Sequence, residues 1–213
     1  MDVLPYLPDL AAALGLFLLG FLVIGPNIAA IMATSMHQGR QDGLRLAMGI
    51  GLGSGIWATL TVAGLASLLT AYAGAVLVLK LFGAAFLLWL AFKSFRSALR
   101  ADAPLPSATP ITGRNLFLTG LTIQLTNPKA ALQWIAIAAV AINGDAPWVI
   151  GALLIVSATC LSLLGHAAYA LTFSTAPIVS LYAHTRRWTE GALGVFFTLA
   201  AFKLATAPLS GRS

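Results

Sequence analysis

Long apolar stretches that could each cross a bilayer alternate with short polar segments along this chain. Residues 10–36 contain no Asp, Glu, Lys or Arg, and Leu46 to Leu79 carry no formal charge. As one helix, the second stretch would measure about 50 Å, more than the roughly 30 Å of a hydrocarbon core. It must therefore turn, and we place the turn near residues 70–74. The pattern predicts six spans, at about 10–36, 46–69, 75–95, 116–142, 147–172 and 188–207.

The composition favours the same fold class, an all-α membrane protein. Apolar residues make up 59% of the 213 residues and charged residues only 8%, against about 25% charged in a typical soluble domain. The net charge of +6 is too scattered for a phosphate-binding surface, so we expect no nucleic-acid partner. The single cysteine, Cys160, excludes a disulfide framework. We expect no cofactor and no metal; the partners are the lipid bilayer and a small-molecule substrate, with homo-oligomerisation left open.

A proline-rich polar linker divides the chain nearly in half. Prolines and small polar residues at the density of residues 99–114 break helices. Three spans on either side of it give halves that face opposite ways, and spans three and six both end in Ala-Phe-Lys, at 91–93 and 201–203. We therefore predict one transporter domain, 1–213, with inverted three-helix repeats at about 8–98 and 115–210 and the linker in the cytoplasm.

The cationic residues predict the orientation in the membrane. Most of them fall in the loops that follow spans one, three and five, and cytoplasmic loops are enriched in Lys and Arg. Both termini are then expected outside the cytoplasm. The N-terminus lacks a basic region and a small-residue cleavage site, so the first apolar segment is interpreted as a retained span. The loop cations are Arg40, Arg45, Lys93, Arg96, Arg100, Arg114, Arg186 and Arg187.

Gly25-Pro26-Asn27 lies inside the first predicted span. Proline in a helix interior removes a backbone hydrogen bond and clashes with the preceding turn. In lipid, the freed carbonyls need partners in the protein or in a water-lined cavity. Asn27 is one such partner, or it faces a substrate. Taken alone, the motif fits an ordinary proline kink equally well.

Asn127-Pro128-Lys129 forms a second break, in span four. A lysine in mid-span costs roughly 2.5 to 3.5 kcal/mol on insertion scales, which favours a function over a side chain that merely extends to the interface. We place Asp and Glu outside the spans, which leaves Lys129 to pair with carbonyls, amide side chains or an anionic ligand. The helix restarting after Pro128 also offers free N–H groups and a positive dipole end to an anion.

Each of the other polar residues within the spans can be interpreted in two ways. Lys80, near the start of span three, extends to the interface or points inward. His166 in span five is a hydrogen-bonded structural residue or a proton carrier. With carboxylates placed outside the spans, Lys80, Lys129 and His166 are the candidates for proton coupling, and export of metal cations is disfavoured. Closely spaced glycines in span two are expected to permit close helix packing: Gly49, Gly51, Gly53 and Gly55.

In this order and at these distances, the motifs resemble the LysE/RhtB family of bacterial amino-acid exporters over nearly the whole chain. Ile24-Gly25-Pro26-Asn27 keeps three of the four residues of the family's Pro-Gly-Pro-Asn. Ile24 replaces the first proline, which predicts a shallower break. The further matching positions are Gly39, Gly43, Gly49 and Gly53; Leu79-Lys80, Gly83-Ala84 and Leu87; and Phe117, Gly120 and Asn127-Pro128-Lys129.

The resemblance implies a secondary transporter that exports amino acids or closely related small metabolites across the bacterial inner membrane, driven by the proton gradient. The residues suggest a recognition scheme in which a substrate carboxylate meets Lys129 and the helix start after Pro128. The substrate ammonium then meets carbonyls freed by Pro26. The predicted substrate-binding residues are Gly25, Pro26, Asn27, Asn127, Pro128, Lys129 and Lys80, and those for proton coupling are His166, Lys129 and Lys80.

Two other classes of protein were weighed against a transporter. An intramembrane serine hydrolase would use Ser54 and His166, but a serine in span two and a histidine in span five do not match known intramembrane serine proteases. A structural membrane subunit without transport leaves Lys129 unexplained. We therefore expect a protein that is not an enzyme and has no catalytic residues.

Overall fold

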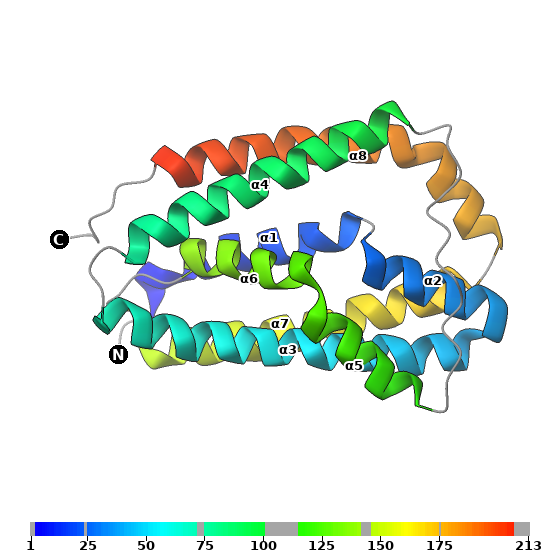
Figure 1. The fold of residues 1–213 in the computed structure, drawn as a ribbon, viewed down its shortest axis with the longest axis horizontal. Helices are drawn as coiled ribbons and strands as arrows, with labels where there is room; N and C mark the ends of the chain where they lie inside the picture. The colour runs from blue at the N-terminus through cyan, green and yellow to red at the C-terminus, as the bar shows by residue number, and fades with distance from the viewer. Residues whose placement is uncertain are drawn as a thin grey trace.

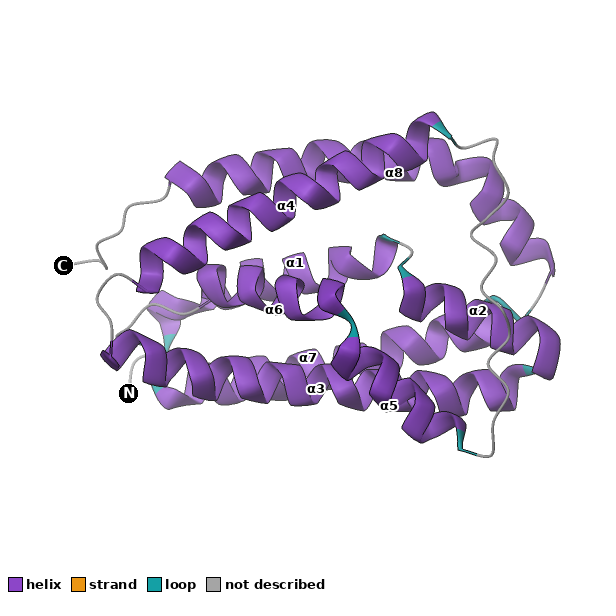
Figure 2. Ribbon diagram, in the orientation of Figure 1, coloured by secondary structure: helices purple, strands orange, loops and turns teal. Residues whose placement is uncertain are grey.

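The fold is a bundle of helices (Figures 1 and 2). The computed structural model describes residues 3–23, 25–71, 75–100, 115–141, 146–174 and 176–206. For residues 65–71, 75–76, 79–80, 141 and 176–183 only the backbone is described. The predicted all-α class is confirmed for the described residues, which form η1 (Leu4–Tyr6), α1 (Leu7–Leu22), α2 (Pro26–Gln38), α3 (Arg40–Ala71), α4 (Ala75–Leu99), α5 (Leu116–Thr126), α6 (Pro128–Ala141), α7 (Trp148–Thr172) and α8 (Ala176–Thr206).

Fewer helices meet the length and hydropathy of a membrane span than the sequence pattern predicts. The fourth predicted span is divided at Asn127 into α5 and α6, and each is too short to cross a bilayer alone. Helix α8 carries Glu190 and Lys203 within its predicted span. In the described part of the chain, four segments are long and apolar enough to span: Leu4–Leu22, Arg40–Gly64, Leu81–Leu99 and Trp148–Thr172.

The helices form two long pairs with the interrupted helices between and beside them (Figure 1). Helix α4 packs along α8, and α3 packs along α7. Helices α1 and α6 pack on each other and lie between the two pairs, whereas α2 and α5 pack on α3. The start of α1 and the end of α8 lie at the same end of the bundle (Figure 1).

Two apolar clusters make up most of the core. The larger one joins α1, α4, α6 and α8 with parts of α3 and α7, and Phe17, Trp134 and Phe197 are among its members. The smaller one joins α2, α3, α5 and α7 around Ile31 and Ile50. The chain passes from one cluster to the other at the breaks between α1 and α2 and between α5 and α6.

The glycines of α3 let two neighbouring helices approach closely. Gly49 and Gly53 face α5, and a Cβ added at Gly49 would lie 1.9 Å from the Phe117 carbonyl oxygen. Gly51 and Gly55 face α7, where an added Cβ would lie within 3 Å of side-chain atoms. The predicted packing role of these four glycines is confirmed, since larger residues would force α5 and α7 away from α3.

Large apolar side chains cover much of the outer surface. Soluble monomers rarely expose contiguous apolar patches of more than a few hundred Å², so a surface of this kind fits contact with lipid. Strongly exposed members include Leu60, Phe82, Phe92, Leu164, Leu199 and Phe202.

Candidate functional site

The two helix breaks face each other at the centre of the bundle. Helix α1 ends at Leu22 and α2 begins at Pro26, while α5 ends at Thr126 and α6 begins at Pro128. Asn127 Nδ2 donates to Asn27 Oδ1 over 2.8 Å. Asn27 Nδ2 in turn donates to Gln124 Oε1. This amide chain links α2 to the end of α5 and the start of α6.

The break between α5 and α6 is stabilised by its own residues. Asn127 Oδ1 accepts from the backbone N–H of Lys129 over 2.9 Å, which is the hydrogen bond of an N-terminal helix cap. The Asn127 backbone N–H donates to the Gln124 carbonyl over 3.3 Å. Pro128 occupies the first turn, where its missing N–H costs nothing. Helix α6 therefore begins with its first turn largely satisfied.

The break between α1 and α2 depends on other helices. Gly25 precedes α2 and provides no side-chain cap. The Val23 carbonyl, at the end of α1, accepts from Lys129 Nζ over 2.8 Å. Gly25 leaves room for that lysine, because an added Cβ would lie 3.2 Å from Nζ. The ammonium of Lys129 thus pairs with one of the carbonyls exposed by the broken first helix.

Two further donors reach the last turns of α1, and the sequence analysis missed both. Tyr169 Oη, on α7, donates to the Phe21 carbonyl over 2.5 Å. Gln133 Nε2, on α6, donates to the Phe17 carbonyl over 3.4 Å. A glutamine one turn after Lys129, on the same face of α6, was the available signal. Tyr169 thus satisfies a carbonyl that the end of α1 leaves without a partner within the helix, whereas Gln133 adds a second bond to a carbonyl one turn earlier.

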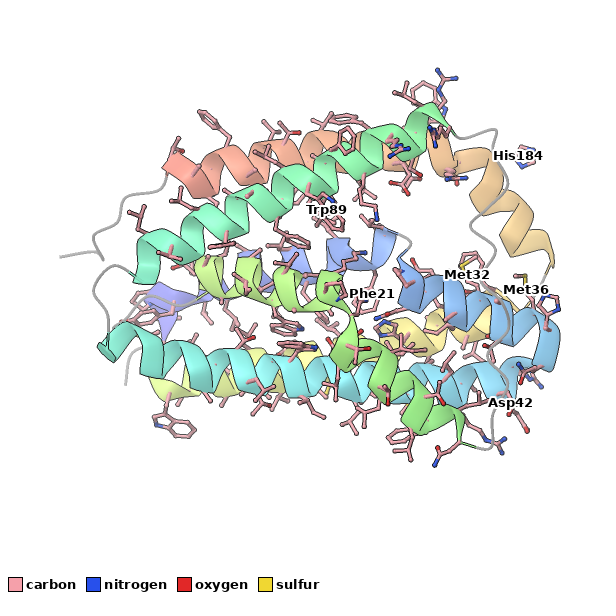
Figure 3. All side chains as sticks on the ribbon, viewed as in Figure 1. Phe21, Met32, Met36, Asp42, Trp89 and His184 are labelled. Carbon is pink, nitrogen blue, oxygen red and sulfur yellow. The ribbon has the colours of Figure 1, made fainter. Side chains whose placement is uncertain are left out.

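A small cavity lies between the breaks and α7. Its volume is about 50 Å³, which is room for water molecules rather than for a whole amino acid. Phe21, labelled in Figure 3, contributes to its wall beside the end of α1. The polar or candidate residues that line it are Gly25, Asn27, Ser54, Gln124, Asn127, Lys129, Gln133 and His166.

The remaining predicted site residues are placed differently. Pro26 and Pro128 are exposed and do not line the cavity. Lys80 lies in α4, but its side chain is outside the described residues, as is Ile24 altogether. The structure therefore brings together Gly25, Asn27, Asn127 and Lys129 from the predicted set, with His166 nearby.

His166 is held within its own helix. Its Nδ1 lies 2.9 Å from the Ser162 carbonyl oxygen and 3.2 Å from Ser162 Oγ, so the ring is held by the preceding turn of α7. The imidazole also packs on Phe21, with 4.8 Å between ring centroids. Ser54 lines the same cavity, yet among the described residues no hydrogen bond joins it to His166. A serine–histidine dyad gains no support from this geometry.

The expectation that every Asp and Glu lies outside the spans is wrong. Glu190 lies within the predicted span 188–207 and is only 3% exposed. Helix α8 begins at Ala176, so Glu190 lies in the helix interior, and α4 packs along this helix.

The comparisons with known proteins agree on one family. The model of the LysE type translocator family matches residues 18–207. The chain is 32% identical to an uncharacterized membrane protein of Pseudomonas aeruginosa, over 89% of this chain and 91% of that protein. It is 28% identical to the leucine efflux protein of Klebsiella pneumoniae, over 96% of each.

A third relative, the threonine efflux protein of Escherichia coli, is 25% identical over 81% of this chain and 85% of that protein. No solved structure matches the chain. Because the family model covers most of the sequence, including both helix breaks, the chain belongs to the LysE type translocator family, whose members are membrane transport proteins.

Proposed function

We propose that this protein exports amino acids, or closely related small metabolites, across the bacterial inner membrane in exchange for protons. The observation that carries the proposal is the pairing of Lys129 Nζ with the Val23 carbonyl across the two breaks. It puts a cation and a backbone acceptor side by side in an apolar core. Relatives named as leucine and threonine efflux proteins support the substrate class.

The same pair suggests how a zwitterion binds. The substrate carboxylate replaces the Val23 carbonyl as the partner of Lys129, and the N–H groups at the start of α6 lie beside it. The substrate ammonium then donates to the released Val23 carbonyl. Asn27 and Asn127 hold the two breaks in register through their 2.8 Å hydrogen bond. One internal hydrogen bond is exchanged for two charge-assisted bonds to the substrate.

We further propose that α1–α2 and α5–α6 are each one broken span, which gives six spans in two inverted repeats, 8–98 and 115–210. Contacts related by exchanging the halves support this: α1 packs on α6 as α2 packs on α5, and α2 packs on α7 as α6 packs on α3. In this arrangement the linker, 99–114, is cytoplasmic and both termini lie outside. Lys80 remains a proposed substrate contact.

The helix contacts also support a route for the substrate. Helices α4 and α8 pack on α6 and α1, but in the described part of the chain they make at most slight contact with α2 and α5. The closer packing of these helices lies toward the end that holds the start of α1 (Figure 1). With the termini outside, the side on which α4 and α8 make at most slight contact with α2 and α5 is the cytoplasmic one, and we propose that the substrate enters there. The small central cavity implies that loading needs further separation.

Export can be tested in bacteria that lack their own LysE-family exporters. Cells with the wild-type gene or an empty vector are fed dipeptides that contain leucine or threonine, and free amino acids in the medium are measured by mass spectrometry. We expect faster release and better growth with the gene. Equal release from both strains for all dipeptides, with the protein present in the inner membrane, would contradict the proposal.

A further inference from the structure

We propose that Glu190 is the residue that carries the proton through this transporter, with Ser94 as the partner of its protonated form. This inference rests on the proposed function, proton-coupled export. It assigns to the coupling step a residue outside the central cavity, in place of Lys80, Lys129 and His166.

Glu190 and Ser94 meet inside the interface between α8 and α4. Glu190 is 3% exposed and Ser94 is fully buried. The hydroxyls of Ser94 and Ser97 lie beside the Glu190 carboxyl group. Even so, Glu190 Oε2 and Ser94 Oγ have no hydrogen-bond partner among the described residues. Polar atoms left unpaired in a core are costly, so each such atom calls for an explanation.

A proton that binds and leaves is an explanation that fits both atoms. When Glu190 is protonated, its O–H can donate to Ser94 Oγ, which is then satisfied as an acceptor. When Glu190 is ionised, the Ser94 hydroxyl can rotate and donate to the carboxylate instead. The site therefore offers a hydrogen bond to either protonation state, as a residue that alternates between the two requires.

The charged and titratable groups around Glu190 come from its own helix and from the helices packed near it. On its own helix, Arg186 lies one turn earlier and donates from Nη2 to Ser97 Oγ over 3.1 Å. On α4, Lys93 Nζ lies over the Trp89 ring, 4.7 Å from its centroid. From α6 and α7, the charge of Glu190 interacts with Lys129 and with Tyr169. The titratable group of α1, Asp9, lies in its first turn, at the far end of that helix.

The interaction with Lys129 gives the coupling its sign. An ionised Glu190 and a charged Lys129 carry opposite charges within one apolar bundle and attract each other, and a charged Lys129 is what the substrate carboxylate needs. Protonation of Glu190 removes this support and weakens substrate binding. The proton and the substrate then bind in alternation: a proton taken from outside is released to the cytoplasm, and the substrate moves the opposite way. This is the order that an exporter driven by inward proton flow requires.

The test compares two modes of transport in liposomes that contain purified protein, with radiolabelled leucine and threonine as separate probes. One mode is net transport driven by a pH gradient, and the other is exchange of labelled for unlabelled amino acid at equal pH. Glu190→Gln is permanently neutral, like the protonated form, so we expect net transport to fall at least tenfold. Exchange measured at saturating amino acid should stay within about twofold of wild type, because saturation offsets the weaker substrate binding. Glu190→Asp should recover part of the net transport. Asp42→Asn, which changes a surface acid paired with Arg45, should leave both modes unchanged.

The outcomes separate the two proposals. Wild-type protein that moves neither probe in either mode contradicts the proposed function itself. If wild type transports and Glu190→Gln keeps its response to the pH gradient, Glu190 does not carry the proton. If both Glu190 variants lose exchange as well as net transport, the residue has a structural role and the inference fails.

Discussion

The two breaks differ in how their backbone groups are satisfied. At Asn127-Pro128-Lys129, the Asn127 side chain caps the new helix and the chain needs little from outside. At Gly25-Pro26-Asn27, no side chain caps α2, and the carbonyls at the end of α1 take their donors from α6 and α7. The break at Asn127 therefore satisfies its backbone groups with its own residues, whereas the break at Gly25 depends on donors from other helices.

That difference shows which break can exchange partners with a ligand. A substrate that competes for Lys129 frees the Val23 carbonyl without disturbing the cap on α6, because the cap uses the backbone N–H of Lys129 and not its ammonium. The self-capped break supplies the donor, Lys129, in a fixed position. The uncapped break supplies the Val23 carbonyl, an acceptor that a substrate can replace.

The largest effect is expected from Lys129→Met, which removes the ammonium but keeps the length of the side chain. Loss of a charge-assisted bond to the substrate, about 1.5 to 3 kcal/mol, should reduce export about tenfold to a hundredfold. Stability should change little, because the lost bond to Val23 is offset by the relief of roughly 2.5 to 3.5 kcal/mol of intramembrane charge. Export by cells and the unfolding temperature in detergent measure the two effects.

Lys203→Met is the matched control for that substitution. Lys203 lies in the last turn of α8 with an exposed side chain, so its removal should leave export unchanged. If Lys129→Met exported at the wild-type rate, the second break would not supply the substrate donor. If both lysine variants lost export equally, the effect would belong to net charge and not to the site.

Whether a contact of this site could be predicted from the sequence depends on how far apart its two residues lie along the chain. Asn-Pro is a local signal, since asparagine caps helices and proline suits a first turn, so the start of α6 could be predicted from neighbouring residues. The choice of Val23 as the partner of Lys129 could not, because it depends on how α1 docks against α6.

Glu190 shows the same limit in part. Its place within the predicted span 188–207 is visible in the sequence, but its burial depends on the packing of α4 on α8. In the same way, Tyr169 lies on a helix without charged residues, so no charge pattern marks which face reaches Phe21. The helices themselves were easier to predict, because a long stretch without charged residues directly indicates a helix surrounded by lipid.

A smaller effect is expected at the amides that connect the breaks. Asn127→Ala loses both the cap and the bond to Asn27, and we expect a free energy of unfolding lower by about 2 kcal/mol. Asn127→Ser keeps a capping hydroxyl and should lose about half as much. Asn27→Ala removes no cap and should lose about 1 kcal/mol. Denaturant titration in detergent measures all three.

A double-mutant cycle then isolates the contact between the two asparagines. The combined Asn27→Ala and Asn127→Ala variant should deviate from additivity by about 0.6 kcal/mol, which is the average for hydrogen bonds between membrane helices. If Asn127→Ser were as unstable as Asn127→Ala, the hydroxyl would not act as a cap. If the two asparagine sites were strictly additive, the breaks would be held together by other contacts, such as that of Lys129.

The smallest effect is expected from Gly25→Ala. This substitution tests whether the space beside Gly25 is needed to keep the Lys129 ammonium in its present position. The backbone there, at φ −107° and ψ −176°, suits any residue, so the added methyl acts only through contact. That contact would be 3.2 Å from Lys129 Nζ, at the flexible end of a side chain that can shift by a few tenths of an ångström. A shift of this size should weaken the bonds of the ammonium by about 0.5 kcal/mol, a two- to threefold rise in half-saturation concentration.

Gly15→Ala is the control within α1, since in the described part of the chain no atom outside its own stretch of helix backbone lies within 4 Å of its added Cβ. Kinetics of exchange in liposomes should separate the two variants, with Gly15→Ala equal to wild type. Equal kinetics for both would mean that Lys129 acts without a fixed position on α1, which makes the carbonyl of Val23 an incidental partner. If exchange instead fell further from Gly25→Ala to Gly25→Val, the space left by this glycine would be shown to position Lys129, the donor from the opposite break.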